Sequence, residues 1–138
     1  MQGYSQHRKA YVFDTAAFIA ALQLMMYGVE IYTTGSVIAE VKDSESVQRL
    51  ELSQPVERVS VVDPEKIFVE KATEVAKRFG LLNKLSKTDI DVIALALQLK
   101  EQGYSVTVLT DDYDIQNILQ RIGIDFKSVK TVGIKRRK

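Results

Sequence analysis

The sequence predicts an α/β fold in which a mostly parallel β-sheet lies between layers of helices. Short apolar runs alternate along the chain with segments whose apolar residues recur at helical spacing. Glycines stand where most of the helical segments end, and a nearly all-apolar segment at 90–99 indicates one helix buried at the centre. Strands that alternate with helices pair in parallel, because each crossover returns the chain to the same end of the sheet.

The first part of the chain is predicted to fold as strand, helix and strand. The apolar run at 10–13 ends at Asp14 and predicts a strand. Apolar residues recur at helical spacing over 15–26, which predicts a helix that Gly28 ends. The alternating segment VEIYTT, 29–34, predicts the second strand.

The second part is expected to hold two helices and a strand. Gly35 opens a helix that runs through VIAEVKD to Asp43. Residues 44–53 predict a second short helix, and Pro55 lies beyond it, where it cannot continue a helix. The segment VERVSVVD, 56–63, predicts a further strand, either at an edge of the sheet or replaced by a long loop.

Two longer helices are predicted next. Asp63 and Pro64 supply a cap and a first-turn proline for a helix that ends at Phe79. The segment SKTD, 86–89, matches a capping box with aspartate in place of glutamate. A second helix is therefore expected to run from this box to Gln102.

The last part is predicted as a strand at 104–110, a helix at 112–121 and a short strand at 126–132. There is no internal repeat and no low-complexity linker. We therefore expect one domain over residues 1–132, followed by a basic tail at 133–138.

Composition excludes several classes of protein. The 138 residues include no cysteine, which excludes disulfides, zinc ribbons and cysteine nucleophiles within this sequence, and the single histidine, His7, lies near the start. A histidine-based triad or metal site would depend on that one residue. No apolar run is long enough to span a membrane and the start has no apolar signal core, so a cytoplasmic protein is expected.

Acidic residues from four segments are expected at one edge of the sheet. Asp14 ends the first strand, and Asp111 and Asp112 follow a late strand; ligands in such sheets bind outside the carboxyl ends of the strands. Asp89 opens the buried helix, and Glu40 lies in the helix after the second strand. Capping is the alternative role for the aspartates at helix starts, but it does not explain Glu40 or the second acid of the 111–112 pair.

Carboxylates crowded at one corner repel one another, so the corner is either well solvated or holds a cation. Hard oxygen ligands without histidine or cysteine suit Mg²⁺ or Mn²⁺. Such an ion lowers the pKa of bound water, and a pair of ions can clamp the attacking and leaving oxygens of a phosphodiester. The neighbouring acids Asp91 and Asp114 are interpreted mainly as solvated surface, with support of the metal-binding acids as the alternative.

Basic residues are unevenly placed, although the formal net charge is only +1. The segment that leads to Asp89 carries Arg78, Lys84 and Lys87 with no acid among them, and six more basic residues lie at 127–138. A phosphate-binding surface is the functional interpretation, and a solvated face is the alternative.

Four motifs carry a resemblance to a known family. The segments VFDT with Asp14, VIAEV with Glu40, DIDVIALA with Asp89, and VLTDD with Asp111 or Asp112 resemble the PIN domain, a metal-dependent nuclease fold. The resemblance covers nearly the whole chain and implies that these acids bind one or two Mg²⁺ or Mn²⁺ ions. It favours Asp112 over its neighbour as the fourth acid, because the order T-x-D is common in the family.

Within the family, these segments and TDDYDIQN look most like the Nob-type endonuclease, which trims the 3′ end of precursor small-subunit ribosomal RNA. The resemblance implies a three-layer α/β/α fold, an RNA or pre-ribosomal substrate, and RNA contacts from the basic residues before Asp89. It also suggests Thr15 and Thr110 as hydroxyls that support the metal-binding carboxylates, with cap and strand-end roles as the alternative. PIN domains often pair, so a homodimer is a further expectation.

Nob-type proteins usually carry a cysteine-bearing zinc ribbon, which this sequence lacks. A truncated chain, a ribbonless paralogue and a toxin-like relative are the three explanations. A VapC-like toxin ribonuclease shares the acids, and a non-catalytic RNA-binding module is the other alternative. A response-regulator receiver is disfavoured, because receivers place their acidic pair after the first strand.

Overall fold

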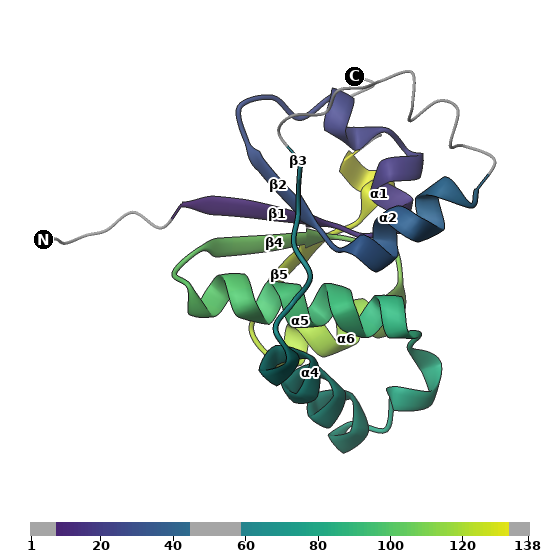
Figure 1. The fold of residues 1–138 in the computed structure, drawn as a ribbon, viewed down its shortest axis with the longest axis vertical. Helices are drawn as coiled ribbons and strands as arrows, with labels where there is room; N and C mark the ends of the chain where they lie inside the picture. Colours follow the sequence, from purple (N-terminus) through teal and green to yellow (C-terminus); the bar gives the residue numbers. More distant parts are fainter. Residues whose placement is uncertain (1–7, 45–58, 133–138) are drawn as a thin grey trace, which may run out of the picture.

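The computed structural model describes residues 8–44 and 59–132, which form an α/β fold with helices on both sides of one sheet (Figure 1). The predicted fold class is confirmed. His7, the tail at 133–138 and nearly all of the helix predicted at 44–53 lie outside the described residues. No helix of the described parts has both the length and the apolar character needed to cross a membrane.

The described strands form a single sheet in the order β3-β2-β1-β4-β5 (Figure 1). Every neighbouring pair is parallel. The strands are β1 (Lys9–Phe13), β2 (Glu30–Thr33), β3 (Val59–Val61), β4 (Ser105–Leu109) and β5 (Asp125–Lys127). The first strand of the chain therefore lies in the middle, and β3 is an edge strand, which was one of the two predicted alternatives.

The helices lie in layers on either side of this sheet, which is a three-layer α/β/α arrangement. Helices α1 and α2 cover one face, α5 and α6 cover the other, and α4 packs on α5 (Figure 1). The helices are α1 (Thr15–Ile19), α2 (Gly35–Lys42), α4 (Lys66–Arg78), α5 (Lys87–Glu101) and α6 (Tyr113–Arg121), with 3-10 turns η1 (Leu22–Leu24) and η2 (Leu82–Lys84). Residues Ile93 to Ala96 of α5 are fully buried, so the prediction of a central buried helix is confirmed.

The helix predicted over 15–26 is wrong in its second half. Helix α1 ends at Ile19, and Ala21 adopts a φ of 58° before η1 begins. The left-handed conformation costs a non-glycine residue roughly 1–2 kcal/mol. The change of direction buries Leu22 completely, which contributes about 1.5–3 kcal/mol and offsets that cost.

Helix α4 begins later than predicted, at Lys66, and Asp63 does not cap it. The Asp63 carboxylate instead accepts a hydrogen bond of 2.9 Å from the backbone N–H of Gly35, at the start of α2. A Cβ atom on residue 35 would lie 3.0 Å from that carboxylate oxygen, so only glycine allows this approach without a shift. The start of α4 is attached to α5, because the Glu65 N–H donates to the Gln98 side chain at 2.7 Å.

The final strand is shorter than the predicted 126–132. Strand β5 ends at Lys127, and residues 129–132 are helical. The Asp111 Oδ1 atom accepts hydrogen bonds from the Ser128 hydroxyl at 2.6 Å and from the Val129 N–H at 2.8 Å. A carboxylate that accepts from consecutive groups in this way caps a helical turn, and this cap ends the strand.

The capping box predicted at 86–89 is present and provides a test of helix α5. Ser86 Oγ accepts from the Asp89 N–H at 3.1 Å, and Asp89 Oδ2 accepts from the Ser86 N–H at 2.8 Å. Replacing Ser86 with alanine removes one acceptor, so we expect the free energy of unfolding in urea to fall by about 1 kcal/mol. The control is Ser60→Ala on the exposed edge strand β3, which should change it by less than about 0.5 kcal/mol. Equal effects of the two substitutions would contradict the capping role.

Candidate active site

The carboxyl ends of the two central strands bring three of the predicted acids to one edge. Phe13 is paired with Leu109, and the backbone N–H of Asp14 donates to the Leu109 carbonyl at 3.3 Å. Asp14 directly follows β1, and Asp111 and Asp112 lie two and three residues beyond the end of β4. These three acids therefore lie at the carboxyl ends of the parallel strands, which is the edge of the sheet that the strand order predicted.

Asp14 is the most enclosed of the five candidate acids (Asp14, Glu40, Asp89, Asp111 and Asp112), with 9% of its surface exposed. Its side chain caps α1 by accepting a 3.3 Å hydrogen bond from the Ala17 N–H. Burial raises the pKa of Asp14 to about 6, and the negative charge of Asp111 adds to the rise. Hydrogen bonds from Thr110 and from the backbone of Ala17 oppose it. Near neutral pH the group is therefore poised close to its protonation point.

Thr110 connects the acids that follow the two central strands. Its side chain is fully buried, and its hydrogen bond lowers the pKa of Asp14. The same hydroxyl oxygen accepts from the Asp112 N–H at 3.1 Å. The Thr110 carbonyl also accepts from the Gln116 amide at 2.8 Å, which fixes the start of α6 against the strand. The hydroxyl suggested to support the acids thus contacts two of them.

Asp111 and Asp112 each use one oxygen to cap a different helical turn. Asp112 Oδ1 accepts from the backbone N–H groups of Asp114 at 2.8 Å and Ile115 at 3.2 Å, at the start of α6. The hydrogen bonds described above commit Asp111 Oδ1 to the turn that follows β5. Capping and a functional role are therefore compatible, because the second oxygen of each carboxylate is not used by these caps.

Asp89 and Glu40 approach the edge from α5 and α2. Burial raises the pKa of Asp89, and the charges of Asp112 and Glu40 add to that rise, so each of these two carboxylates lies within electrostatic reach of Asp89. Glu40 is exposed and accepts a 2.9 Å hydrogen bond from the Thr15 hydroxyl. Thr15, the other suggested supporting hydroxyl, thus orients the one acid that is not at a helix start.

These five carboxylates have no positive partner in the described parts of the chain, where the ion pairs are Arg8 with Glu30 and Lys87 with Asp91. Within residues 8–44 and 59–132, no three of the acids have the close spacing of a preformed metal cluster. Electrostatic interactions nevertheless connect the four chain segments that carry these acids. Asp14 interacts with Asp111, and Asp89 interacts with Asp112 and with Glu40. A set of hard oxygen donors that repel one another and lack a countercharge suits Mg²⁺ or Mn²⁺.

Asp91 corrects one expectation, because it is a buried residue and not solvated surface. Only 6% of its surface is exposed, and it accepts a 2.8 Å hydrogen bond from the Ser36 hydroxyl. Lys87 lies 3.3 Å from the same carboxylate oxygen and forms an ion pair with it. This network joins α2 to α5 below the edge. The spacing of four residues between Lys87 and Asp91, in a helix otherwise apolar over 90–97, was the signal that could have revealed it.

The basic residues predicted to contact RNA lie on the segment that leads to Asp89. Arg78 is the last residue of α4, Lys84 ends η2, and Lys87 is the first residue of α5. All three are exposed. Lys87 is partly engaged by its ion pair with Asp91, although its side chain is 83% exposed. Arg78 and Lys84 have no such partner among the described residues.

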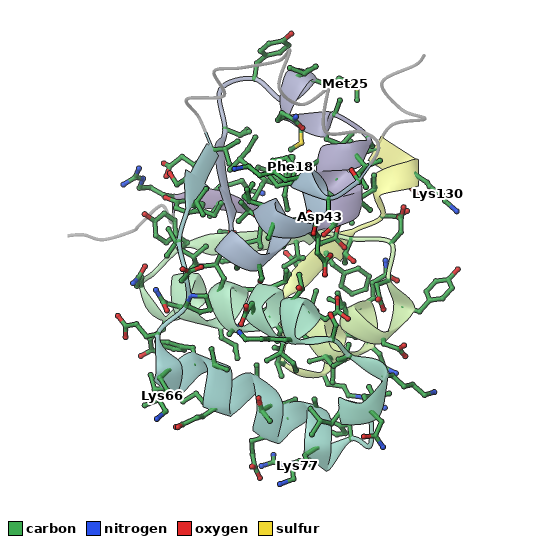
Figure 2. The ribbon with its side chains drawn as sticks, turned by 45° about the vertical axis from the view of Figure 1, so that its right-hand side comes forward. Phe18, Met25, Asp43, Lys66, Lys77 and Lys130 are labelled. Carbon is green, nitrogen blue, oxygen red and sulfur yellow. The ribbon has the colours of Figure 1, made fainter. Side chains whose placement is uncertain are left out.

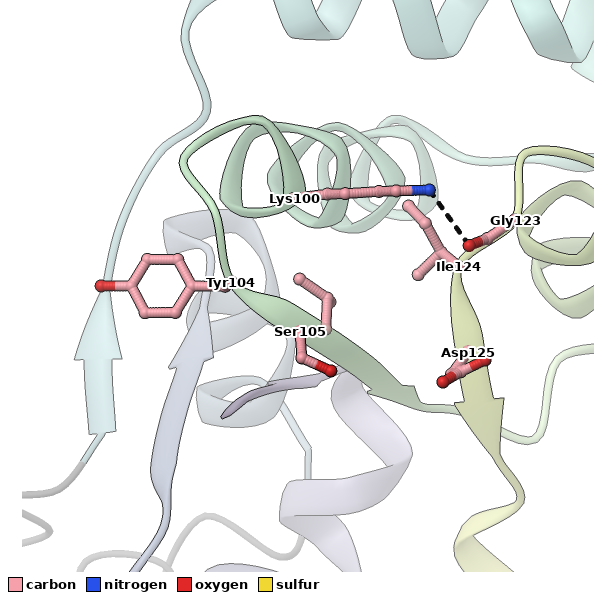
Figure 3. A pocket seen from close by; sticks show the side chains of 7 residues that line it. Lys100, Tyr104, Ser105, Gly123, Ile124 and Asp125 are labelled. Atoms are coloured by element: carbon pink, nitrogen blue, oxygen red, sulfur yellow. Dashed lines mark hydrogen bonds between the residues drawn. The ribbon is translucent and has the colours of Figure 1, made fainter. Parts of the chain in front are cut away.

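A small pocket lies at the opposite edge of the sheet, where β4 and β5 begin (Figure 3). Its lining includes Tyr104, Ser105 and Asp125, and the Lys100 ammonium group donates across it to the Gly123 carbonyl at 3.1 Å. Its volume of about 140 Å³ is smaller than the roughly 300–1,000 Å³ of typical ligand sites. The acids, and not this pocket, are therefore the candidate site.

Comparison with known proteins identifies the family of the chain. A family model described as the PIN domain of ribonuclease matches residues 11–99, which include Asp14, Glu40 and Asp89. Ribonuclease VapC3 of Aeropyrum pernix is 43% identical over 117 residues, which are 85% of this chain and 84% of that protein.

Two further relatives are named as endonucleases. Endoribonuclease Nob1 of Methanothermobacter thermautotrophicus is 38% identical over 124 residues, which cover 90% of this chain and 71% of that protein. The 20S-pre-rRNA D-site endonuclease nob1 of Schizosaccharomyces pombe is 37% identical over 92 residues, which cover 64% of this chain and 23% of that much longer protein. From the family match, these similarities and the three-layer fold, we conclude that the chain belongs to the PIN-domain family of ribonucleases.

Proposed function

We propose that this chain is a metal-dependent endoribonuclease that matures the 3′ end of small-subunit ribosomal RNA. The observation that carries the proposal is that Asp14, Asp111 and Asp112 follow the carboxyl ends of β1 and β4, that Asp89 interacts electrostatically with Asp112 and Glu40, and that none of these acids has a countercharge in the described chain. The names of the Nob1 relatives support the endonuclease activity, and the name of the yeast relative supports a ribosomal precursor as the substrate.

In this proposal Asp14, Glu40, Asp89 and Asp112 hold one or two Mg²⁺ or Mn²⁺ ions, with Asp111 beside them. The bound ions supply an activated water and stabilise charge on the phosphodiester. The chain orients the ligands: the Thr15 hydroxyl directs Glu40, the Ser86 N–H directs Asp89, and the caps of α1 and α6 direct the remaining two. Each carboxylate thereby keeps a fixed orientation toward the edge, which is a requirement of a site that positions a reacting phosphate.

Cleavage of an end-labelled RNA that spans the 3′ end of small-subunit ribosomal RNA tests the proposal. The reactions contain Mn²⁺, Mg²⁺ or a chelator. A discrete cut at the mature end that requires the metal is the expected result. Cutting that is equal in chelator would overturn the metal dependence, and the absence of cutting with either metal would overturn the activity. We also propose that the protein is cytoplasmic and forms a homodimer. Sedimentation with and without RNA measures its oligomeric state.

A toxin ribonuclease is the second candidate, and the 43% identity to VapC3 over most of both chains favours it. A toxin is expected to arrest growth when it is expressed alone and to cut other cellular RNAs in preference to the ribosomal precursor. The same cleavage assay with a transfer RNA and a messenger RNA separates the two candidates. A cut restricted to the mature 3′ end, with normal growth, would exclude the toxin.

The basic residues before Asp89 should contribute electrostatic contacts to RNA. Replacing Arg78 and Lys84 with alanine removes two charges, so we expect weaker binding to all sequences and a slope of log affinity against log salt that is smaller by about 1–1.5. Fluorescence anisotropy over a range of salt concentrations measures the slope. Lys66→Ala is the control, because Lys66 lies at the other end of α4 and points away from the protein (Figure 2). An unchanged slope in the double variant would contradict these contacts.

A further inference from the structure

The outer face of helix α6 carries a row of exposed side chains that begins at the acidic edge. Tyr113, Asn117 and Arg121 are spaced four residues apart, and all three are exposed. Residues at this spacing lie on the same side of a helix. Eight residues at 1.5 Å each separate the first from the last by about 12 Å. We name these three residues, with Phe79 under Arg121, the α6 track.

Tyr113 has the most exposed side chain among the large apolar and aromatic residues that the structure describes, at 84%. It is the first residue of α6 and directly follows Asp112, one of the candidate metal ligands. A large aromatic ring exposed to water gains nothing from packing, and aromatic rings beside nucleic-acid sites commonly stack on bases. Tyr113 is therefore an exposed aromatic residue directly beside one of the candidate metal ligands.

Arg121 is held in place at the other end of the track. Its guanidinium carbon lies 4.4 Å from the centre of the Phe79 ring, and its Nε donates to Asn117 Oδ1 at 2.8 Å. No carboxylate of the described residues forms an ion pair with it. The remaining guanidinium N–H groups are therefore able to bind a phosphate. Phe79 directly follows Arg78, so the track is continuous with the proposed basic segment.

We propose that the α6 track binds single-stranded RNA beside the cleavage site, with a base stacked on Tyr113 and the backbone bound by Arg121. The inference rests on the proposed function, because it uses the acidic edge as the place where the RNA is cut. Stacking requires an unpaired base, so the track should prefer single strands to duplexes. It therefore adds a requirement about the substrate, namely unpaired nucleotides on the α6 side of the cut.

The test measures RNA binding separately from cleavage. A fluorescein-labelled single-stranded RNA is titrated with the Asp14→Asn variant in Mg²⁺, with or without a second substitution. Tyr113→Ala should weaken binding roughly tenfold, whereas Tyr113→Phe should bind within about twofold of the parent because its ring still stacks. Arg121→Gln should reduce the salt slope by about 0.7. The matched control is Tyr27→Ala, at a residue that is 73% exposed and precedes β2 at the opposite edge of the sheet.

Three results would overturn the inference. The first is binding by Tyr113→Ala that equals the parent, and the second is a loss with Tyr113→Phe as large as with alanine. The third is an equal loss for a duplex of the same sequence. Failure of the proposed nuclease would be recognised separately. If the wild-type protein cuts no RNA but Tyr113→Ala still weakens single-strand binding, the α6 track is supported and the catalytic proposal is contradicted. If cleavage occurs but Tyr113 has no effect on binding, only the track falls.

Discussion

Replacing Asp14 with asparagine is expected to reduce metal-dependent RNA cleavage by at least about 100-fold without unfolding the protein. Loss of a residue that merely supports a metal ligand costs about 10–100-fold, so loss of a ligand's charge should cost at least the upper value. Asparagine keeps an oxygen that can accept the Ala17 N–H, and it caps helices as well as aspartate does. The substitution therefore removes the charge and leaves the local structure in place.

Single-turnover cleavage of the labelled ribosomal RNA in Mn²⁺ measures this effect, and circular dichroism confirms the fold of the variant. Asp125→Asn is the matched control, because Asp125 is an exposed aspartate at the opposite edge of the same sheet. We expect its rate to stay within about twofold of the wild type. Wild-type rates in Asp14→Asn, or equal losses in both variants, would show that the acidic edge is not the catalytic site.

The second large effect concerns the contribution of Asp14 to the stability of the metal-free protein, which should fall as the pH rises from about 4 to about 7. The folded protein retains a proton on Asp14 up to a pKa of about 6, whereas the unfolded chain loses it near the ordinary value of 3.8. Between these two values the folded state binds more protons, so raising the pH destabilises it. The shift corresponds to at most about 3 kcal/mol, and Asp89, whose pKa burial also raises, acts in the same direction.

Urea unfolding of the wild type and of Asp14→Asn in chelator isolates the contribution of Asp14, because the other acids are common to both proteins. Near pH 4 the two free energies of unfolding should agree. At pH 7 the asparagine variant should be more stable by about 1–3 kcal/mol, and Mn²⁺ should reduce that advantage by stabilising the wild type. A difference that does not vary with pH would mean that Asp14 is not buried as described.

The sequence predicted the features that depend on local spacing. The period of the apolar residues identified the central helix α5, and SKTD predicted its capping box. The order of strands and helices predicted the edge at which Asp14, Asp111 and Asp112 stand, because the carboxyl ends of parallel strands share one edge.

The errors arose where a contact from a distant segment decided the outcome. The helix breaks at Ala21 because Leu22 is buried in the core. Asp63 was predicted to cap α4, but it accepts a hydrogen bond from Gly35 at the start of α2 instead. Asp91 was misassigned because Ser36 and Lys87 satisfy it inside the protein. The contacts of Asp63 with Gly35 and of Ser36 with Asp91 depend on how the layers pack, whereas the four-residue spacing of Lys87 and Asp91 in one helix could have been recognised.

The central place of β1 in the sheet has a consequence for synthesis of the protein. Lys9 of β1 pairs with Ser105 of β4, so β1 cannot complete its pairing until a strand 96 residues later in the chain has been translated. At about 5–20 residues per second this interval lasts roughly 5–20 s. Until β4 emerges from the ribosome, Asp14 cannot meet Asp112, and the nascent chain holds only part of its acidic edge. The acidic edge is therefore completed only after most of the domain has been synthesised.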